Sequence, residues 1–292
     1  MTQSIYKTPT GEAEMHAIYD QKLAKLNLPY ESITLDTSFG HTHVLQFGPP
    51  AAPPLVLLHG GNSINPLNLG WLKPLLTRYR VYAPDTIGHP GKSAPTRISP
   101  RDDSYGRWLV ELLDALGLEQ TAIMGGSYGA GILLKTAVTA PNRISKAILF
   151  IPSGIVSIPM KTMGSMLWGL AAYKIAPSPD RLKRIMQPMF LDNPIDPEVE
   201  QITEAVFRLT IIETAMPKNV TQAELADFHA PTLVIAAGDD RLFPATAVTN
   251  RAPELFPNLV AAETIPGASH YLAPRYHAEL NERCLAFLEM DQ

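Results

Sequence analysis

Short, mostly apolar runs alternate with helix-forming stretches along this chain of 292 residues. Leu55–Leu58, Arg80–Ala83 and Thr121–Met124 are such runs, and glycine or proline follows each within two residues. A short apolar run bounded by turn residues is typical of a strand covered on both faces, as in a parallel sheet. Strands that alternate with helices indicate a doubly wound sheet. We therefore expect an α/β fold.

Further segments fit this pattern. Tyr30–Asp36 and His41–Phe47 flank Thr37–Gly40, which predicts a hairpin. Gly117 stands where a glycine commonly ends a helix. The other predicted strands are Ala147–Ile151, Thr232–Ala237 and Ala262–Ile265, and the predicted helices are Ser104–Leu116 and Tyr128–Thr139.

The alternation stops between about residues 153 and 230, where the patterns are helical. Ser178-Pro179 and Asp196-Pro197 each predict a helix start, with a capping residue before a proline at the first helical position. An amphipathic helix face is predicted by apolar residues at spacings of three and four, which are Val199, Ile202, Val206 and Leu209. Thr221 and Glu224 predict a capping box. We expect a core formed by residues 1–153 and 231–292, with a helical cap, 154–230, over the carboxyl edge of the sheet.

Composition narrows the class of protein. The chain is 46% hydrophobic and 18% charged, with a formal net charge of −4, so it lacks the basic surface that nucleic-acid binding requires. No apolar run approaches the roughly 18 residues of a membrane span, and the N-terminus does not resemble a signal peptide. We expect a cytoplasmic protein, and the sequence leaves the oligomeric state open.

Gly125-Gly126-Ser127-Tyr128-Gly129 matches the nucleophile motif G-x-S-x-G. A predicted strand enters this pentapeptide and a predicted helix leaves it. Such a sharp turn holds its central residue in a strained conformation and needs glycine's missing side chain nearby. It would raise the Ser127 hydroxyl at a helix N-terminus, where developing negative charge is favoured. The competing interpretation is a glycine-rich turn whose serine only caps a helix.

A serine hydroxyl needs a base, and the base needs an acceptor that orients it. His270 follows the strand Ala262–Ile265 and is the favoured base. Asp239 and Asp240 follow the strand Thr232–Ala237, and either could reach the histidine; we favour Asp240. Ile151–Gly154 follows the preceding strand without a carboxylate. The order Ser127, Asp240, His270 is the order of this motif's triad.

The oxyanion of an acyl-transfer reaction requires preset donors. The backbone N–H of Tyr128 is one candidate and that of Gly61 is the second, with His59 bracing the loop. The predicted substrate contacts are Asn62, Met163, Met166 and Trp168. Methionine-rich helices suit an apolar acyl or aryl group, but these side chains could equally pack the cap onto the sheet.

Five blocks in this order resemble the capped serine hydrolases of the α/β-hydrolase superfamily, from about Tyr30 to the end of the chain. The blocks are His59–Gly61, Asp85–Ser93, Gly125–Gly129, Asp240–Pro244 and Gly267–His270. The resemblance implies an eight-stranded, mostly parallel sheet, with a cap inserted before the strand that precedes the catalytic acid. It also implies the triad roles for Ser127, Asp240 and His270. Pro90 departs from the commoner glycine-rich form of the second block.

The sequence thus predicts a serine hydrolase that cleaves a small carboxylic ester through an acyl-enzyme, without a metal or organic cofactor. Carbon–carbon bond hydrolases, lactonases, cofactor-free haloperoxidases and prolyl aminopeptidases share the triad and remain alternatives. A ligand-binding protein without catalysis is an alternative of another class. A weaker hypothesis makes the methionine-rich cap a contact for a lipid surface.

Overall fold

The structure, a computed structural model, describes residues 4–191 and 195–290 and centres on one eight-stranded sheet. The strand order is β1-β2-β4-β3-β5-β6-β7-β8. The pairs β1–β2 and β2–β4 are antiparallel and all later pairs are parallel. The strands are β1 Tyr30–Thr37, β2 Gly40–Phe47, β3 Pro54–Leu58, β4 Arg80–Pro84, β5 Thr121–Gly126, β6 Ile144–Phe150, β7 Thr232–Ala237 and β8 Leu259–Ile265. The predicted fold class is confirmed.

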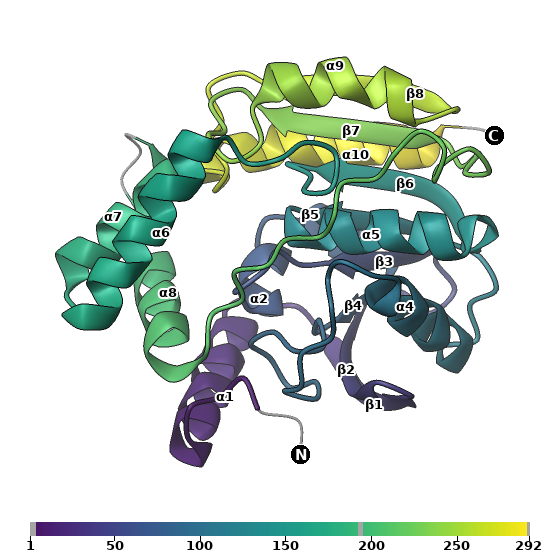
Figure 1. The fold of residues 1–292 in the computed structure, drawn as a ribbon. Coiled ribbons are helices and arrows are strands. Elements are labelled where there is room, and N and C mark those ends of the chain that lie inside the picture. The colour runs from purple at the N-terminus through teal and green to yellow at the C-terminus, as the bar shows by residue number, and fades with distance from the viewer. Residues whose placement is uncertain (1–3, 192–194, 291–292) are drawn as a thin grey trace.

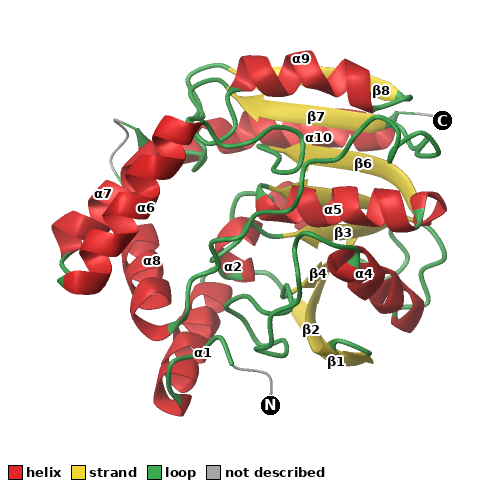
Figure 2. Ribbon diagram, viewed as in Figure 1, coloured by secondary structure: helices red, strands yellow, loops and turns green. Residues whose placement is uncertain are grey.

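Helices cover both faces of the sheet (Figure 2). Helices α4, α5 and α9 supply the core on one face through Trp108, Ile132 and Val248, while α3 and α10 supply the other through Leu75 and Leu280. The helices are α1 Pro9–Ala24, α2 Asn65–Leu69, α3 Lys73–Arg78, α4 Ser104–Ala115, α5 Tyr128–Thr139, α6 Met160–Ile175, α7 Pro179–Phe190, α8 Pro197–Leu209, α9 Ala245–Leu255 and α10 His277–Glu289, with 3₁₀ turns at Pro141–Arg143 and Pro274–Tyr276. Coverage on both faces explains why every residue of β7 is buried.

Helices α6, α7 and α8 stand apart from the sheet, on the side to which the parallel strands point (Figure 1). Ser178 caps α7 by accepting the Arg181 N–H, and Asp196 caps α8 by accepting the Glu198 N–H. The predicted apolar face of α8 is buried. Both helix starts therefore follow from local capping chemistry.

Two local features differ from the sequence-based expectation. The Thr221–Glu224 capping box forms its hydrogen bonds, but the residues after it make turns instead of a helix. Helix α1 has no counterpart among the predicted elements, because its buried Met15, Tyr19 and Leu23 make a sparse apolar pattern.

Candidate active site

Ser127 lies in the tight turn between β5 and α5, with φ 51° and ψ −114°. The packing of this turn leaves no room for a Cβ at Gly125, before the serine, or at Gly129, after it. A Cβ added at Gly125 would lie 2.5 Å from the Gly129 carbonyl group, and one added at Gly129 would lie 2.3 Å from the Leu58 oxygen. At Gly126 the nearest atom would be 3.9 Å away. Two of the three glycines are therefore sterically required, and they hold Ser127 at the start of α5.

Three loops that leave the carboxyl ends of β5, β7 and β8 meet at this turn. The Ser127 Oγ lies 3.0 Å from His270 Nε2, and His270 Nδ1 lies 2.8 Å from Asp240 Oδ2. His270 and Asp240 are 8% and 5% exposed. Asp239, the alternative acid, is exposed and has no part in this chain of contacts. The structure thus brings together the three residues that the sequence favours.

The backbone also holds Asp240 in place. Its Oδ1 accepts the N–H groups of Leu242 at 2.7 Å and Phe243 at 3.2 Å, so Oδ2 remains directed at the histidine. With Nδ1–H donated to the carboxylate, Nε2 of a neutral His270 is left to accept the Ser127 proton. This is the tautomer that general-base catalysis needs.

The loop after β3 brings Gly61 against Tyr128, the residue that follows the serine. A Cβ at Gly61 would fall 3.1 Å from the Tyr128 Cβ. The Gly60 N–H is donated to Asn68 Oδ1 at 2.9 Å. The two predicted oxyanion donors are therefore neighbours, and Asn68 anchors the loop that carries one of them.

Asn62 has a left-handed backbone, with φ 48°, and its side chain is fully engaged. Its Nδ2 donates to the Glu213 carbonyl oxygen and its Oδ1 accepts the Glu213 N–H, each at 2.8 Å. The sequence predicts Asn62 as a substrate contact. It borders the cavity, but its amide joins the loop after β3 to the segment that follows α8.

Two buried histidines support the same loop as neutral acceptors. His89 Nδ1 accepts the Asn62 N–H at 3.1 Å, and His59 Nε2 accepts the Thr86 N–H at 2.9 Å. Burial lowers the pKa of His89 well below 6.5, and the charges of His59 and Arg97 lower it further. Burial also lowers the pKa of His59, although Asp85 acts in the opposite direction. The bracing role predicted for His59 agrees with this geometry.

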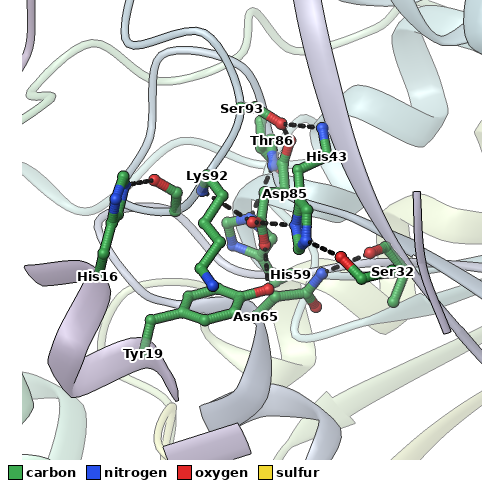
Figure 3. Close-up of polar contacts among 12 residues, drawn as sticks. His16, Tyr19, Ser32, His43, His59, Asn65, Asp85, Thr86, Lys92 and Ser93 are labelled. Atoms are coloured by element: carbon green, nitrogen blue, oxygen red, sulfur yellow. Dashed lines mark hydrogen bonds and ion pairs between the residues drawn. The ribbon is translucent and has the colours of Figure 1, made fainter. Parts of the chain in front are cut away.

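A second Ser–His–Asp array lies at the antiparallel end of the sheet (Figure 3). Ser32 Oγ is 2.7 Å from His43 Nε2, and His43 Nδ1 is 2.8 Å from Asp85 Oδ2. The Asp85 carboxylate also accepts the Tyr19 hydroxyl and the Lys92 N–H, each at 2.9 Å. Ser32 lies within the regular strand β1 and not at a helix start, so the array lacks the setting of Ser127. Its contacts tie α1, β2 and the loop after β4 together.

A largely apolar cavity of about 250 Å³ opens above Ser127 and His270. Helices α6, α7 and α8 all line it, and Trp71 and Tyr271 contribute from the core. Met163 and Met166, both predicted as substrate contacts, line the cavity. Trp168 does not line it and is 78% exposed, because it points to the outer side of α6. The residues of α6 that line the cavity therefore lie on one side of the helix.

Glu213 also lines the cavity, and no sequence feature pointed to it. Its Oε1 accepts the Ala215 N–H at 2.7 Å and its Oε2 lies 3.3 Å from Arg97 Nε. Glu213 lies in a segment of the sequence that has neither a motif nor an apolar periodicity. His89, by contrast, lies in the Asp85–Ser93 block, and its proximity to the loop after β3 follows from the parallel pairing of β3 with β4.

Comparison with known proteins finds similar hydrolases. Residues 53–187 match the family described as alpha/beta hydrolase fold. Carboxylesterase YbfK of Bacillus subtilis is 27% identical over 92% of each chain. The 2-hydroxymuconate semialdehyde hydrolase of Pseudomonas putida is 30% identical over 74% of this chain and 76% of its own. The crystal structure of naproxen esterase from Bacillus subtilis superposes with a TM-score of 0.85 at 25% identity, covering 97% of this chain and 100% of its own. This chain belongs to the α/β-hydrolase family.

Proposed function

We propose that this protein is a serine carboxylesterase that cleaves small apolar esters through an acyl-enzyme. The observation that carries the proposal is the Ser127–His270–Asp240 chain of contacts at the base of an apolar cavity. Two full-length relatives of the chain carry the name carboxylesterase, which supports the same conclusion.

In the first half-reaction His270 takes the Ser127 proton while Oγ forms a bond to the ester carbonyl carbon. The backbone N–H groups of Gly61 and Tyr128 stabilise the oxyanion. The tetrahedral intermediate collapses, and the protonated His270 gives its proton to the departing alkoxide. The alcohol leaves, and the acyl group remains on Ser127.

In the second half-reaction water attacks the acyl carbon as His270 takes one of its protons. A second tetrahedral intermediate forms in the same oxyanion hole. The bond to Ser127 breaks, His270 returns the proton to Oγ, and the carboxylic acid leaves. Asp240 remains ionised and holds His270 in the productive tautomer throughout.

The charge of the lining favours an uncharged substrate. Among the described residues that line the cavity, Glu213 is the acidic one and no lysine or arginine occurs. A muconate-type substrate is an anion, and the described residues that line the cavity include no lysine or arginine to pair with its carboxylate, since Arg97 outside the lining faces Glu213. This charge distribution favours an ester over the anionic substrates of the carbon–carbon bond hydrolases. Met163 and Met166 line this apolar cavity, which supports them as contacts for the acyl or alcohol group.

The test is hydrolysis of p-nitrophenyl esters from acetate to decanoate by the wild type, Ser127→Ala and Ser32→Ala. We expect Ser127→Ala to lose at least about a thousandfold in kcat/KM, and Ser32→Ala to stay within about twofold of the wild type. A fluorophosphonate should label the wild type and not Ser127→Ala. Labelling without ester turnover, combined with cleavage of 2-hydroxymuconate semialdehyde, would establish a carbon–carbon bond hydrolase instead. Neither turnover nor labelling would indicate a binding protein.

A further inference from the structure

Helix α6 exposes an apolar stripe beside the residues that line the cavity. Met160 is 91% exposed, Leu167 51%, Trp168 78% and Ile175 84%. Their spacings of seven and eight residues place them on one side of the helix. The adjoining side of the helix lines the cavity through residues that include Met163 and Met166, and Leu167 lies at the boundary between the two sides. A surface helix normally turns polar side chains to water, so the composition of this outer side requires a reason.

The charges on the two helices that carry and adjoin this stripe are mostly positive. Residues 160–190, which form α6 and α7, contain five basic residues and one acidic residue, whereas the whole chain has a net charge of −4. The acidic residue is Asp180, and the basic residues are Lys161, Lys174, Arg181, Lys183 and Arg184. Lys161 and Lys174 are exposed near the two ends of the stripe. A basic segment on an acidic protein is complementary to an anionic surface.

We propose that the outer side of α6 binds the surface of an anionic lipid bilayer. Met160, Leu167, Trp168 and Ile175 would enter the interface between headgroups and acyl chains, and Lys161 and Lys174 would lie at the level of the headgroup phosphates. An interfacial helix with apolar side chains on one side, a tryptophan and flanking lysines binds membranes by this combination of burial and charge. Among the described residues, no helix is long and apolar enough to cross a membrane, so the contact is peripheral.

A second copy of this chain fits the stripe less well than a lipid surface does. Two copies that paired through α6 would bring their basic α6–α7 segments together, and like charges repel. A stable protein interface also buries about 800 Å² on each partner, which exceeds what four side chains on one helix supply. The lipid surface satisfies both the apolar stripe and its charge.

The position of the stripe connects it with the cavity. Leu167 is half exposed and also lines the cavity, so the membrane would contact the same helix that covers the catalytic serine. Membrane binding itself does not require the esterase activity proposed above. The two proposals can therefore fail separately.

The experiment is sedimentation of the full-length protein with two kinds of vesicle, one of phosphatidylcholine alone and one with about a third phosphatidylglycerol. We expect binding to the anionic vesicles, weaker binding to the neutral ones, and a loss of binding in high salt. Trp168→Ser combined with Ile175→Ser should lower the partition coefficient at least about tenfold, since each removes an inserted side chain. Lys161→Gln combined with Lys174→Gln should lower the partition coefficient about tenfold on anionic vesicles and change it little on neutral ones.

The matched control removes exposed apolar side chains elsewhere. Val260 and Met290 are 40% and 50% exposed, and Val260→Ser with Met290→Ser should leave binding unchanged. Failure of the wild type to bind anionic vesicles would overturn the proposal, as would equal binding by the α6 variant and this control. A dimer in size-exclusion chromatography that Trp168→Ser with Ile175→Ser converts to a monomer would overturn it in favour of a contact between copies.

Discussion

Two adjacent carboxylates, Asp239 and Asp240, follow β7, and their surroundings set their roles. Asp240 is 5% exposed, with one oxygen on two backbone N–H groups and the other on His270. Asp239 is exposed, although its own N–H is donated to the Ala268 carbonyl oxygen at 2.8 Å. Asp240 therefore contacts His270, the proposed base, while Asp239 contributes to the turn through its backbone.

Asp240→Asn should lower kcat by about a thousandfold or more, because the amide favours the wrong histidine tautomer. Asp239→Asn is the matched control and should stay within about twofold of the wild type. The measurement is kcat for p-nitrophenyl ester hydrolysis, with thermal melts to show that both variants fold. A larger loss for Asp239→Asn would reassign the triad acid.

Asn62 offers a second test at the residue scale, because its side chain supports the loop that carries Gly61. Asn62→Ala removes both hydrogen bonds to the Glu213 backbone and keeps a Cβ in a left-handed conformation. Asn62→Gly removes the same bonds without that strain. We expect kcat to fall about tenfold in both variants. The alanine variant should also unfold with about 1 kcal/mol less free energy than the glycine variant.

These expectations are checked by steady-state kinetics and by urea denaturation of the two variants. An unchanged kcat in both variants would show that the two hydrogen bonds between Asn62 and the Glu213 backbone do not position the oxyanion hole. A loss of kcat in Asn62→Ala alone would assign the effect to backbone strain.

At the level of helices and strands, the junction of β5 and α5 positions Ser127, the proposed nucleophile. Gly125 of the strand lies against the backbone of Gly129 at the start of the helix, and Gly129 lies against the backbone of Leu58 in the neighbouring strand β3. The side-by-side order of β5, β6, β7 and β8 then brings the loops with Asp240 and His270 to Ser127. The site is therefore a product of strand order as much as of the residues themselves.

Gly125→Ala should destabilise the fold by about 2–3 kcal/mol, because the added Cβ would overlap the Gly129 backbone. Gly126→Ala is the matched control, since its Cβ would lie 3.9 Å from the nearest atom, and it should change the free energy of unfolding by less than about 1 kcal/mol. Urea denaturation compares the two. Equal stabilities would show that the junction relaxes more easily than its packing suggests.

At the scale of the whole molecule, buried neutral histidines make stability depend on pH. Burial lowers the pKa values of His59 and His89 in the folded protein, so the unfolded chain binds protons more readily. Their contribution to stability is full above pH 6.5, the ordinary histidine value, and is lost as the pH falls below it. Protonation of each histidine can lower the free energy of unfolding by at most about 1.4 kcal/mol per pH unit.

We therefore expect the Tm of the wild type to fall between pH 7.5 and pH 5.5. His89→Asn keeps an acceptor near the Asn62 N–H without a titrating ring, so its Tm should fall by a smaller amount over the same interval. His229→Asn, at an exposed position, is the control and should match the wild-type slope. Identical slopes for all three proteins would assign the pH dependence to other groups.

The local patterns predicted most of the core. The segments Tyr128–Thr139 and Thr232–Ala237 are helix and strand with the same bounds in the structure, because apolar periodicity and glycine or proline boundaries act over a few residues. Helix α1 gave no such signal, because its few buried side chains make a sparse apolar pattern. Trp168 was predicted on the cavity side of α6 and lies outside it. Periodicity cannot orient a helix that is apolar on two sides.

The strand, turn and helix around Ser127 could be predicted from the sequence, because the close approach of Gly125 to Gly129 is local, and so could the histidine and aspartates that follow later strands. Only the tertiary structure decided which aspartate faces His270, and it joined Asn62 to Glu213 across 151 residues. Contacts of this kind depend on how the strands order and how the helices dock, and their energies come from partners that no window of the chain contains.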